Sequence, residues 1–411
     1  MFEGFEEQLE RYARLTVNVG MNVQPGQQVI VRAAGEAAEL VRLIARHSYQ
    51  AGARIVDVLW DDERLQAERL RHARPDTLDV VPEWRFEMLR AGGEGGCATV
   101  RVSTPDPDAM NGVDPESVAR VRKAAGPHAV RFTRLVNAGH VNWCVVSCPT
   151  PAWAAKVFPH LPEGERLPAL WRAVLAAVRA DREDTVQAWQ AHVQDIAARR
   201  DWLNDQRFQA LKYRGPGTDL TVGLADTHNW VGASSLTRGG TEYIANIPTE
   251  EVFTTPHRER VDGTVTASKP LNLDGVLVEG LRVTFAGGRA VNVQADTNAA
   301  SIRKILETDE GAARLGEVAL VPASSPINRT GLLFLDTLFD ENAASHIAFG
   351  RAYQEAMQGG EDKELSELEK LGANDSLIHE DWMIGSEEVD VDGIKADGST
   401  VPVMRAGEWA F

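Results

Sequence analysis

Residues 331–353, GLLFLDTLFDENAASHIAFGRAY, and residues 376–388, SLIHEDWMIGSEE, are the two stretches around which the chain is organised. Each places a histidine and several carboxylates among apolar residues. Imidazole and carboxylate ligands together suit divalent metals such as zinc, cobalt and manganese. The two stretches therefore predict a metal site in the last hundred residues.

The first stretch predicts a buried strand followed by a helix. Residues 332–335, LLFL, fit the strand, and Asp340 is placed as the N-cap of a helix that continues through Glu341. His346 and Tyr353 are seven residues apart, about two helical turns, so we expect them on one face. A lone helical histidine is more often a capping or core residue than a ligand, and Asp340 and Glu341 also fit ordinary charges at a helix N-terminus.

The second stretch is expected to be extended. In a strand, the side chains of His379 and Asp381 emerge on the same side. Such a His-x-Asp pair can hold one ion, although alone it is a weak signal.

The composition excludes several classes of protein. A chain of 411 residues exceeds one ordinary core, so we expect two domains, and 43% hydrophobic with 25% charged residues is typical of a soluble globular protein. Asp and Glu number 60 against 43 Lys and Arg, a formal charge of -17, which argues against nucleic acid and anionic membranes as partners. The N-terminus lacks the features of a signal peptide, and no apolar run approaches the roughly 20 residues of a membrane helix, so we expect a cytoplasmic protein.

The first half of the chain alternates helical and strand patterns. Its glycine-rich residues 92–96, GGEGG, precede a strand instead of joining a strand to a helix, so we expect a flexible turn and no phosphate loop. The pattern predicts an α/β layered domain with a largely parallel sheet, beginning with a βαβ unit. The predicted elements are strand 28–33, helix 36–51, strand 54–60, helices 62–73 and 82–91, strand 97–103, helix 115–125, strand 142–147 and helix 151–158.

The pattern changes near residue 205. Residues 167–204 are helical in spacing and are expected to close the first domain. Strands at 218–224, 275–284 and 290–295, with a hairpin turn at 285–289, then predict a β-rich α+β domain. We therefore divide the chain into an N-terminal α/β domain, 1–204, and a C-terminal metal-binding domain, 205–411.

Three further carboxylates in this second half are candidates for the site. Glu250 and Glu251 lie in NIPTEEVFTTP, residues 246–256, where two prolines make a stiff loop that could present a carboxylate. Taken alone, this loop is better explained as a solvated turn. Glu317 leads into an apolar strand and, at its edge, could be merely exposed.

Taken together, four segments resemble the thermophilic aminopeptidase family, metallopeptidase family M29. They are IPTEEVFTTPHR, LGEVALVP, DTLFDENAASHIAFGRAY and IHEDWMIGSEEVDVDG, in this order and spacing. The resemblance is dense over residues 205–411, and the first half fits in length and α/β character. It implies a two-domain homodimer that removes N-terminal residues from peptides with a free N-terminus, using two divalent metal ions per subunit in its C-terminal domain. Zinc or cobalt is expected first, with manganese or magnesium as alternatives.

The resemblance also implies roles for individual residues. Glu317 would bridge the two ions, and Tyr353 matches an active-site tyrosine that could donate a hydrogen bond to the oxyanion. The adjacent Glu250 leaves open which of the two glutamates is the ligand. The implied metal ligands are Glu251, Glu317, His346, His379 and Asp381.

Hydrolysis at such a site uses a water activated between the two ions, and its proton must reach the leaving amine. Glu250 and Glu341 are candidates for this transfer because they lie beside ligand motifs. Two other functions stay open at this point. A dinuclear-metal hydrolase of phosphoesters or small amides is possible on the same ligands, but no arginine cluster or phosphate loop accompanies them. An inactive peptide-binding or structural protein would be supported by a missing ligand, and all five are present.

Overall fold

The computed structural model describes residues 1–273 and 276–411. The chain has a parallel sheet in its N-terminal part and antiparallel sheets in its C-terminal part, so the predicted α/β and α+β fold class is confirmed. No helix in these described residues is long and apolar enough to cross a membrane. The chain divides into two compact units, the first formed by Met1–Ala191 and Ser234–Pro248, the second by His192–Ala233 and Thr249–Phe411. The domain boundary near residue 205 stays a prediction.

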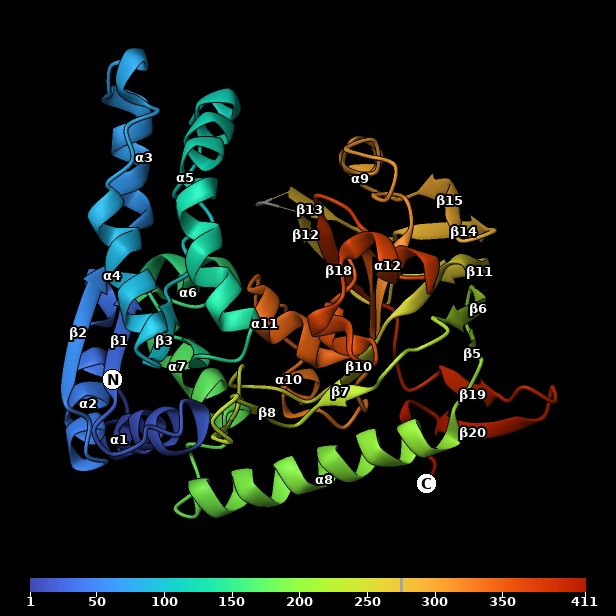
Figure 1. Cartoon of the computed structure of the whole chain (residues 1–411), viewed down its shortest axis with the longest axis horizontal. Helices are drawn as coiled ribbons and strands as arrows, with labels where there is room; N and C mark the ends of the chain where they lie inside the picture. The colour runs from blue at the N-terminus through green and yellow to red at the C-terminus, as the bar shows by residue number, and fades with distance from the viewer. Residues whose placement is uncertain (274–275) are drawn as a thin grey trace. The chain divides into compact units, whose positions relative to one another are not determined.

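The first unit is built on a four-stranded sheet with the order β2-β1-β3-β4, in which all neighbouring strands are parallel (Figure 1). Its elements are α1 (Phe5–Leu15), β1 (Gln28–Ala33), α2 (Ala38–Gln50), β2 (Ile55–Trp60), α3 (Glu63–His72), α4 (Glu83–Glu94), β3 (Ala98–Ser103), α5 (Pro115–Asn137), β4 (Asn142–Ser147), α6 (Pro151–Val157), α7 (Glu163–Ala177), the start of α8 (Thr185–Gln206), β8 (Ser235–Leu236) and β9 (Glu242–Tyr243). The predicted βαβ unit is present as β1, α2 and β2.

The expectation of a flexible glycine turn at residues 92–96 is wrong in part. Gly92 and Gly93 belong to helix α4 and are buried. A Cβ atom on Gly92 would lie 2.5 Å from Cδ1 of Ile30 in β1. The absence of a side chain therefore lets α4 lie close against the sheet, which a pattern of glycines does not reveal. Helix α5 is also longer than the predicted helix 115–125, and it packs with α4 over the same face.

The second unit contains a five-stranded sheet, β18-β17-β16-β10-β7, and an eight-stranded sheet, β15-β14-β11-β6-β5-β19-β20-β21 (Figure 1). Their strands are β5 (Ala210–Gly215), β6 (Thr218–Leu224), β7 (Val231–Gly232), β10 (Val252–Thr254), β11 (Pro256–Thr266), β14 (Arg282–Ala286), β15 (Arg289–Gln294), β16 (Leu315–Leu320), β17 (His346–Gly350), β18 (His379–Met383), β19 (Asp390–Ile394), β20 (Thr400–Arg405) and β21 (Glu408–Trp409). The remaining elements are β12 (Leu271–Leu273), β13 (Val276–Val278), α9 (Ala299–Ile305), α10 (Pro326–Arg329), α11 (Thr337–Asp340) and α12 (Leu365–Lys370). The predicted strand 275–284 is two strands, β13 and β14, and its first residue lies outside the described residues.

The two large sheets of this unit share one hydrophobic core. Only Thr255 separates β10 from β11, so the chain passes directly from one sheet to the other. Val252 and Ile347 of the five-stranded sheet and Tyr213 of the eight-stranded sheet belong to the same buried cluster. Because side chains alternate along a strand, His346 lies on the face of the five-stranded sheet that is turned away from this core.

The predicted strand-then-helix order of residues 332–353 is wrong. Residues 332–335 form neither a strand nor a helix, α11 is a single turn that ends at Asp340, and His346 begins strand β17. Asp340 does not cap a helix with its side chain; its buried carboxylate accepts hydrogen bonds from the backbone N–H groups of Phe334 (2.7 Å) and Asp336 (3.3 Å). A short apolar run such as HIAFG fits a buried strand as well as a helix, and pairing with β16 and β18 decides between them.

Candidate metal centre

Four of the predicted metal ligands lie on the outer face of the five-stranded sheet. Strand pairing aligns Glu317 of β16 with Ala348 of β17, and Ala348 with Asp381 of β18. His346 precedes Ala348 by two residues, and His379 precedes Asp381 by two. The period of two in a strand therefore directs both histidines and both carboxylates to one side.

A first group of ligand atoms is formed by Glu251, Glu317 and His346. Glu251 directly precedes β10, the neighbour of β16 in the sheet. Nε2 of His346 lies 3.2 Å from Oε2 of Glu251 and 3.6 Å from Oε1 of Glu317. All three residues are buried, and each offers one ligand atom within 4.8 Å of the others.

A second group is formed by Glu317, His379 and Asp381. Nε2 of His379 lies 3.3 Å from Oε2 of Glu317 and 3.4 Å from Oδ1 of Asp381. Glu317 thus belongs to both groups, and each of its two oxygens faces a different histidine. The expectation that Glu317 could be merely exposed at a strand edge is wrong, since only 4% of its surface is accessible.

Backbone carbonyls fix the orientation of both imidazole rings. Nδ1 of His346 lies 3.2 Å from the carbonyl oxygen of Ala344, and Nδ1 of His379 lies 2.7 Å from that of Arg351. In the neutral imidazole, each Nδ1–H can donate to its carbonyl, which leaves Nε2 with a lone pair that faces the carboxylates. This is the usual arrangement of histidines that bind a metal, because the second nitrogen holds the ring in place.

The donor set fits divalent cations. Oε2 of Glu251 and Oδ1 of Asp381 are buried and, when the two histidines are neutral, accept no hydrogen bond from the part of the chain that the structure describes. Burying a carboxylate oxygen without a donor is costly, and a cation bound between the two groups would remove that cost. Nitrogen and oxygen ligands of this kind suit zinc, cobalt, manganese or magnesium.

The charges of the cluster depend strongly on one another. Burial would raise the pKa of Glu317, but hydrogen bonds to His346 and His379 outweigh it and lower that pKa to about 2. Burial opposes the charged form of His379, yet Asp381 and Glu317 raise its pKa to about 11. In the same way, Glu251 and Glu317 overcome burial and raise the pKa of His346 well above its ordinary value. A cation that binds here must displace these protons, so its affinity increases with pH.

The two candidates for proton transfer lie in different surroundings. Burial, followed by the charges of Glu251 and Asp381, raises the pKa of Glu341 well above its ordinary value, so its carboxyl group stands in the field of the cluster. The Glu250 carboxylate instead lies 3.5 Å from Nε2 of His192, on helix α8. The solvated turn considered for Glu250 and Glu251 is wrong, because both are buried.

Tyr353 does not share a helix with His346, since it follows strand β17 in a loop. Its ring nevertheless reaches the cluster, with its centroid 4.7 Å from that of His379 and 5.8 Å from that of Phe253. Burial and then the charge of Glu317 raise the pKa of Tyr353, so the phenol stays neutral and can donate a hydrogen bond. With 43% of its surface accessible, it lies at the open side of the cluster.

Sequence reasoning missed the residues that hold the ligand loops in place. Asn342 is fully buried; its Oδ1 accepts a hydrogen bond from the backbone N–H of Glu250 (2.7 Å), and its Nδ2 donates to the carbonyl of Leu338 (2.9 Å). His192 lies 2.8 Å from the carbonyl oxygen of Thr249. Asn342 lies within the motif quoted above and could have been singled out there, but nothing near His192 in the sequence relates it to a loop more than fifty residues away.

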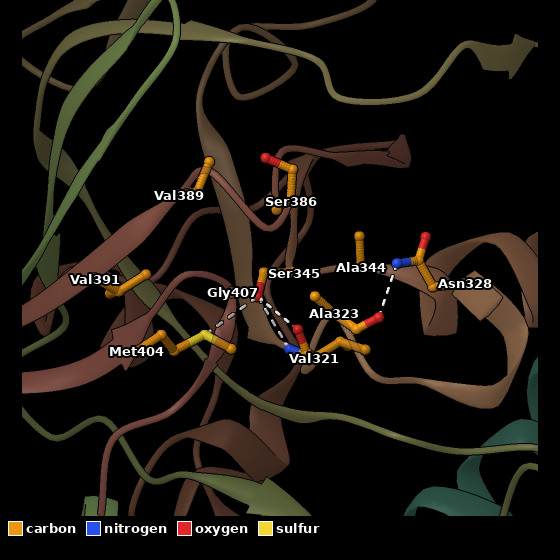
Figure 2. Close-up of a pocket in the computed structure, with 11 residues that line it drawn as sticks. Val321, Ala323, Asn328, Ala344, Ser345, Ser386, Val389, Val391, Met404 and Gly407 are labelled. Carbon is orange, nitrogen blue, oxygen red and sulfur yellow. Dashed lines mark hydrogen bonds between the residues drawn. The ribbon is translucent and has the colours of Figure 1, made fainter. Parts of the chain in front are cut away.

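A small cavity lies beside Ser345, the residue before strand β17, and the core residue Met404 also lines it (Figure 2). Beside it, the hydroxyl of Ser345 donates to the carbonyl of Val321 (3.0 Å) and accepts from its N–H (3.1 Å). The cavity has a volume of about 10 Å³, room for about one water molecule. It is therefore too small to hold a peptide.

Two histidines that share a buried carboxylate, each with a further carboxylate, fit a broad class of protein: the enzymes that bind divalent metal ions. Comparison with known proteins agrees with this class. The chain matches the family described as thermophilic metalloprotease (M29) over residues 5–409. The protein belongs to the M29 family, as the motifs predicted.

Relatives of known name cover the chain almost completely. Aminopeptidase T of Thermus thermophilus is 48% identical over 407 residues, 99% of each chain, and Aminopeptidase AmpS of Bacillus subtilis is 41% identical over 409 residues, 100% of each. A solved structure of wild-type AmpT from Thermus thermophilus superimposes with a TM-score of 0.93 at 47% identity, covering 99% of this chain and 100% of that one. A 2,5-dihydroxypyridine dioxygenase from Pseudomonas putida shares the fold alone, with a TM-score of 0.52 at 11% identity.

Proposed function

We propose that the cluster is a cocatalytic two-metal centre with which this enzyme removes the N-terminal residue of peptides. The protein is a metalloaminopeptidase: membership of the M29 family and aminopeptidases at 39–48% identity over the full length support this activity. One observation carries the two-metal proposal. The two oxygens of Glu317 face different histidines, as a carboxylate that bridges two ions would.

The proposed ligands divide between two positions. Glu251 and His346 would hold one ion, His379 and Asp381 would hold the other, and Glu317 would bridge them. Zinc or cobalt is proposed first, with manganese or magnesium as alternatives. When bound, two such ions lower the pKa of a shared water and polarise the scissile carbonyl.

Two further side chains, Tyr353 and Glu341, are proposed to donate a hydrogen bond or a proton to the substrate. Tyr353 stands at the open side of the cluster as a neutral phenol, so it can donate a hydrogen bond to the oxyanion of the tetrahedral intermediate. Glu341 belongs to neither ligand group but lies among their charges, so we assign it the transfer of a proton to the leaving amine. Glu250, which faces His192, is proposed to position the loop of its neighbour Glu251.

The activity is tested with a short peptide and its N-acetylated twin. Protein freed of metal by chelation and dialysis is assayed for release of free amino acid, with and without zinc, cobalt, manganese or magnesium. We expect metal-restored cleavage of the free peptide only, because the free α-amine is what an aminopeptidase recognises. Cleavage of neither peptide by protein with bound metal would contradict the proposal. The homodimer implied by the family resemblance stays a prediction, which sedimentation equilibrium can test.

A further inference from the structure

The outer face of the five-stranded sheet also carries an aromatic residue beside the ligands. Phe253 follows Glu251 by two residues, so the two side chains share that face. Strand pairing aligns Phe253 with Ala319 of β16, and Ala319 with His346 of β17. Phe253 therefore stands in the same cross-strand row as a proposed metal ligand, separated from it only by an alanine.

Phe253 and Tyr353 form what we call the apolar wall. Their rings meet edge to face, with centroids 5.8 Å apart, and the ring of Tyr353 continues to His379, with centroids 4.7 Å apart. Tyr353 thus joins the apolar wall to the cluster at His379, and Phe253 extends the wall on the other side of Tyr353. Phe253 is half-buried and Tyr353 is 43% exposed, whereas Phe349, on the opposite face of the sheet, is fully buried. An aromatic side chain left partly open beside a reaction site can bury a substrate group.

The position of the apolar wall indicates that it contacts the side chain of the first residue of a bound peptide. In an aminopeptidase, the α-amine and the first carbonyl are both held at the reaction centre, so the first residue is anchored on both sides of its Cα. Its side chain is then within one side-chain length of the ligands. Phe253 lies about 7 Å along the strand from Glu251, a distance that a leucine or phenylalanine side chain can span.

We propose that Phe253 is a specificity-determining residue, whose ring, supported by Tyr353, contacts the side chain of the peptide's first residue and favours large apolar residues there. The inference rests on the proposed aminopeptidase function and names the substrate class of that site. An acidic first residue is disfavoured, because burying its carboxylate against the apolar wall is costly.

The experiment compares Phe253→Ala and Phe253→Leu with the wild-type holoenzyme on peptides X-Gly-Gly, where X is leucine, phenylalanine, alanine or glutamate. Phe253→Ala is expected to lower kcat/KM for leucine and phenylalanine about 10- to 100-fold, and for alanine less than about 3-fold, since an alanine side chain cannot reach the wall. Phe253→Leu keeps an apolar surface and is expected to retain most of the preference. The wild type is expected to cleave the glutamate peptide least.

Phe349→Leu serves as the matched control, because Phe349 lies in the same sheet with its ring stacked on Trp382 in the core. It is expected to lower the melting temperature without changing the ratio of kcat/KM between leucine and alanine. Metal content and melting temperature of each variant identify any that fail to fold. An equal fall of kcat/KM for every X in both Phe253 variants, or no fall, would overturn the inference and leave Phe253 as a support for Tyr353. An inactive wild type would instead refute the proposed function.

Discussion

Glu341 is the residue on which the proposed proton transfer depends. Glu341→Gln keeps the size of the side chain and removes its ability to carry a proton. We expect kcat to fall about 10²- to 10⁴-fold, the usual contribution of a general acid or base, while the protein keeps its metal ions. Turnover and metal stoichiometry, measured on the same preparation, check both parts.

Glu250→Gln is the control, because its carboxylate lies 3.5 Å from Nε2 of His192 and belongs to neither group of ligand atoms. It is expected to have a smaller effect on kcat. Loss of one metal equivalent in Glu341→Gln would move Glu341 into the ligand set, and unchanged turnover would remove it from the mechanism.

Asp340, which directly precedes Glu341, should make the stability of the protein depend on pH. Burial raises the pKa of Asp340 from its ordinary value of 3.8 to about 7. A raised folded-state pKa means that the protonated form is favoured in the folded protein, so this group costs stability increasingly as the pH rises from about 4 to 7. Asp340→Asn cannot ionise. The melting temperature of this variant relative to the wild type should therefore increase from pH 5 to pH 8. The corresponding change in the difference between their free energies of unfolding is on the order of 1–4 kcal/mol.

Thermal melts of both proteins at each pH unit measure this difference. Asp309→Asn is a useful contrast, because hydrogen bonds from the backbone N–H of Leu377 and the hydroxyl of Ser376 lower the pKa of Asp309 despite the opposing effect of burial. Its relative melting temperature should fall as the pH rises toward about 4 and then stay constant from pH 5 to pH 8, because Asp309 is ionised in both the folded and the unfolded state above that pH. A constant difference for Asp340→Asn would show that Asp340 is ionised throughout.

At the scale of elements, the site depends on how separate segments are joined. Asn342 connects the loop that carries Glu251 to the turn that carries Glu341, through hydrogen bonds to Glu250 N–H and the Leu338 carbonyl. Asn342→Leu fills a similar volume but leaves the buried N–H of Glu250 without its acceptor, at a cost of about 1–3 kcal/mol. We expect lower stability and also weaker metal binding, because the Glu251 loop is no longer fixed.

Calorimetric titration of the metal-free protein with metal measures the expected loss of metal affinity. Asn328→Ala provides the control, since its amide donates to the Ala323 carbonyl beside the small cavity, away from the cluster. That variant should lose stability without losing metal affinity. Equal metal affinity in Asn342→Leu and the wild type would restrict Asn342 to a structural role.

The same elements show what can be read from the sequence. The strands of the first unit and the extended segment of His379 follow local patterns in the sequence, and the structure has them close to the predicted residues. The environment of His346 could not be read in this way, because HIAFG fits a strand or a helix until β16 and β18 pair with it. The proposed ligand residues were predicted from long motifs, which do not depend on that choice. The contacts of His192 and the close packing at Gly92 are tertiary and leave no local pattern.

At the scale of the whole molecule, metal binding should slow hydrogen exchange in one of the two units and leave it unchanged in the other. All the proposed ligands lie in the second unit, on or next to strands whose other face forms its core. A ligand that binds only the folded state stabilises it by about 2.7 kcal/mol when its concentration is 100 times its dissociation constant. Zinc should therefore raise the melting temperature of the stripped protein and slow hydrogen exchange in β16, β17 and β18.

The strands β1, β3 and β4 of the first unit hold none of the proposed ligands, so their exchange should stay unchanged under conditions where only local opening is sampled. Glu317→Gln tests the bridging role directly, because an amide offers one oxygen where the carboxylate offers two. Zinc should protect this variant less and bind it at a lower stoichiometry than the wild type. Equal protection and two bound equivalents in Glu317→Gln would exclude a bridging carboxylate and, with it, the reason for placing two ions on one sheet face.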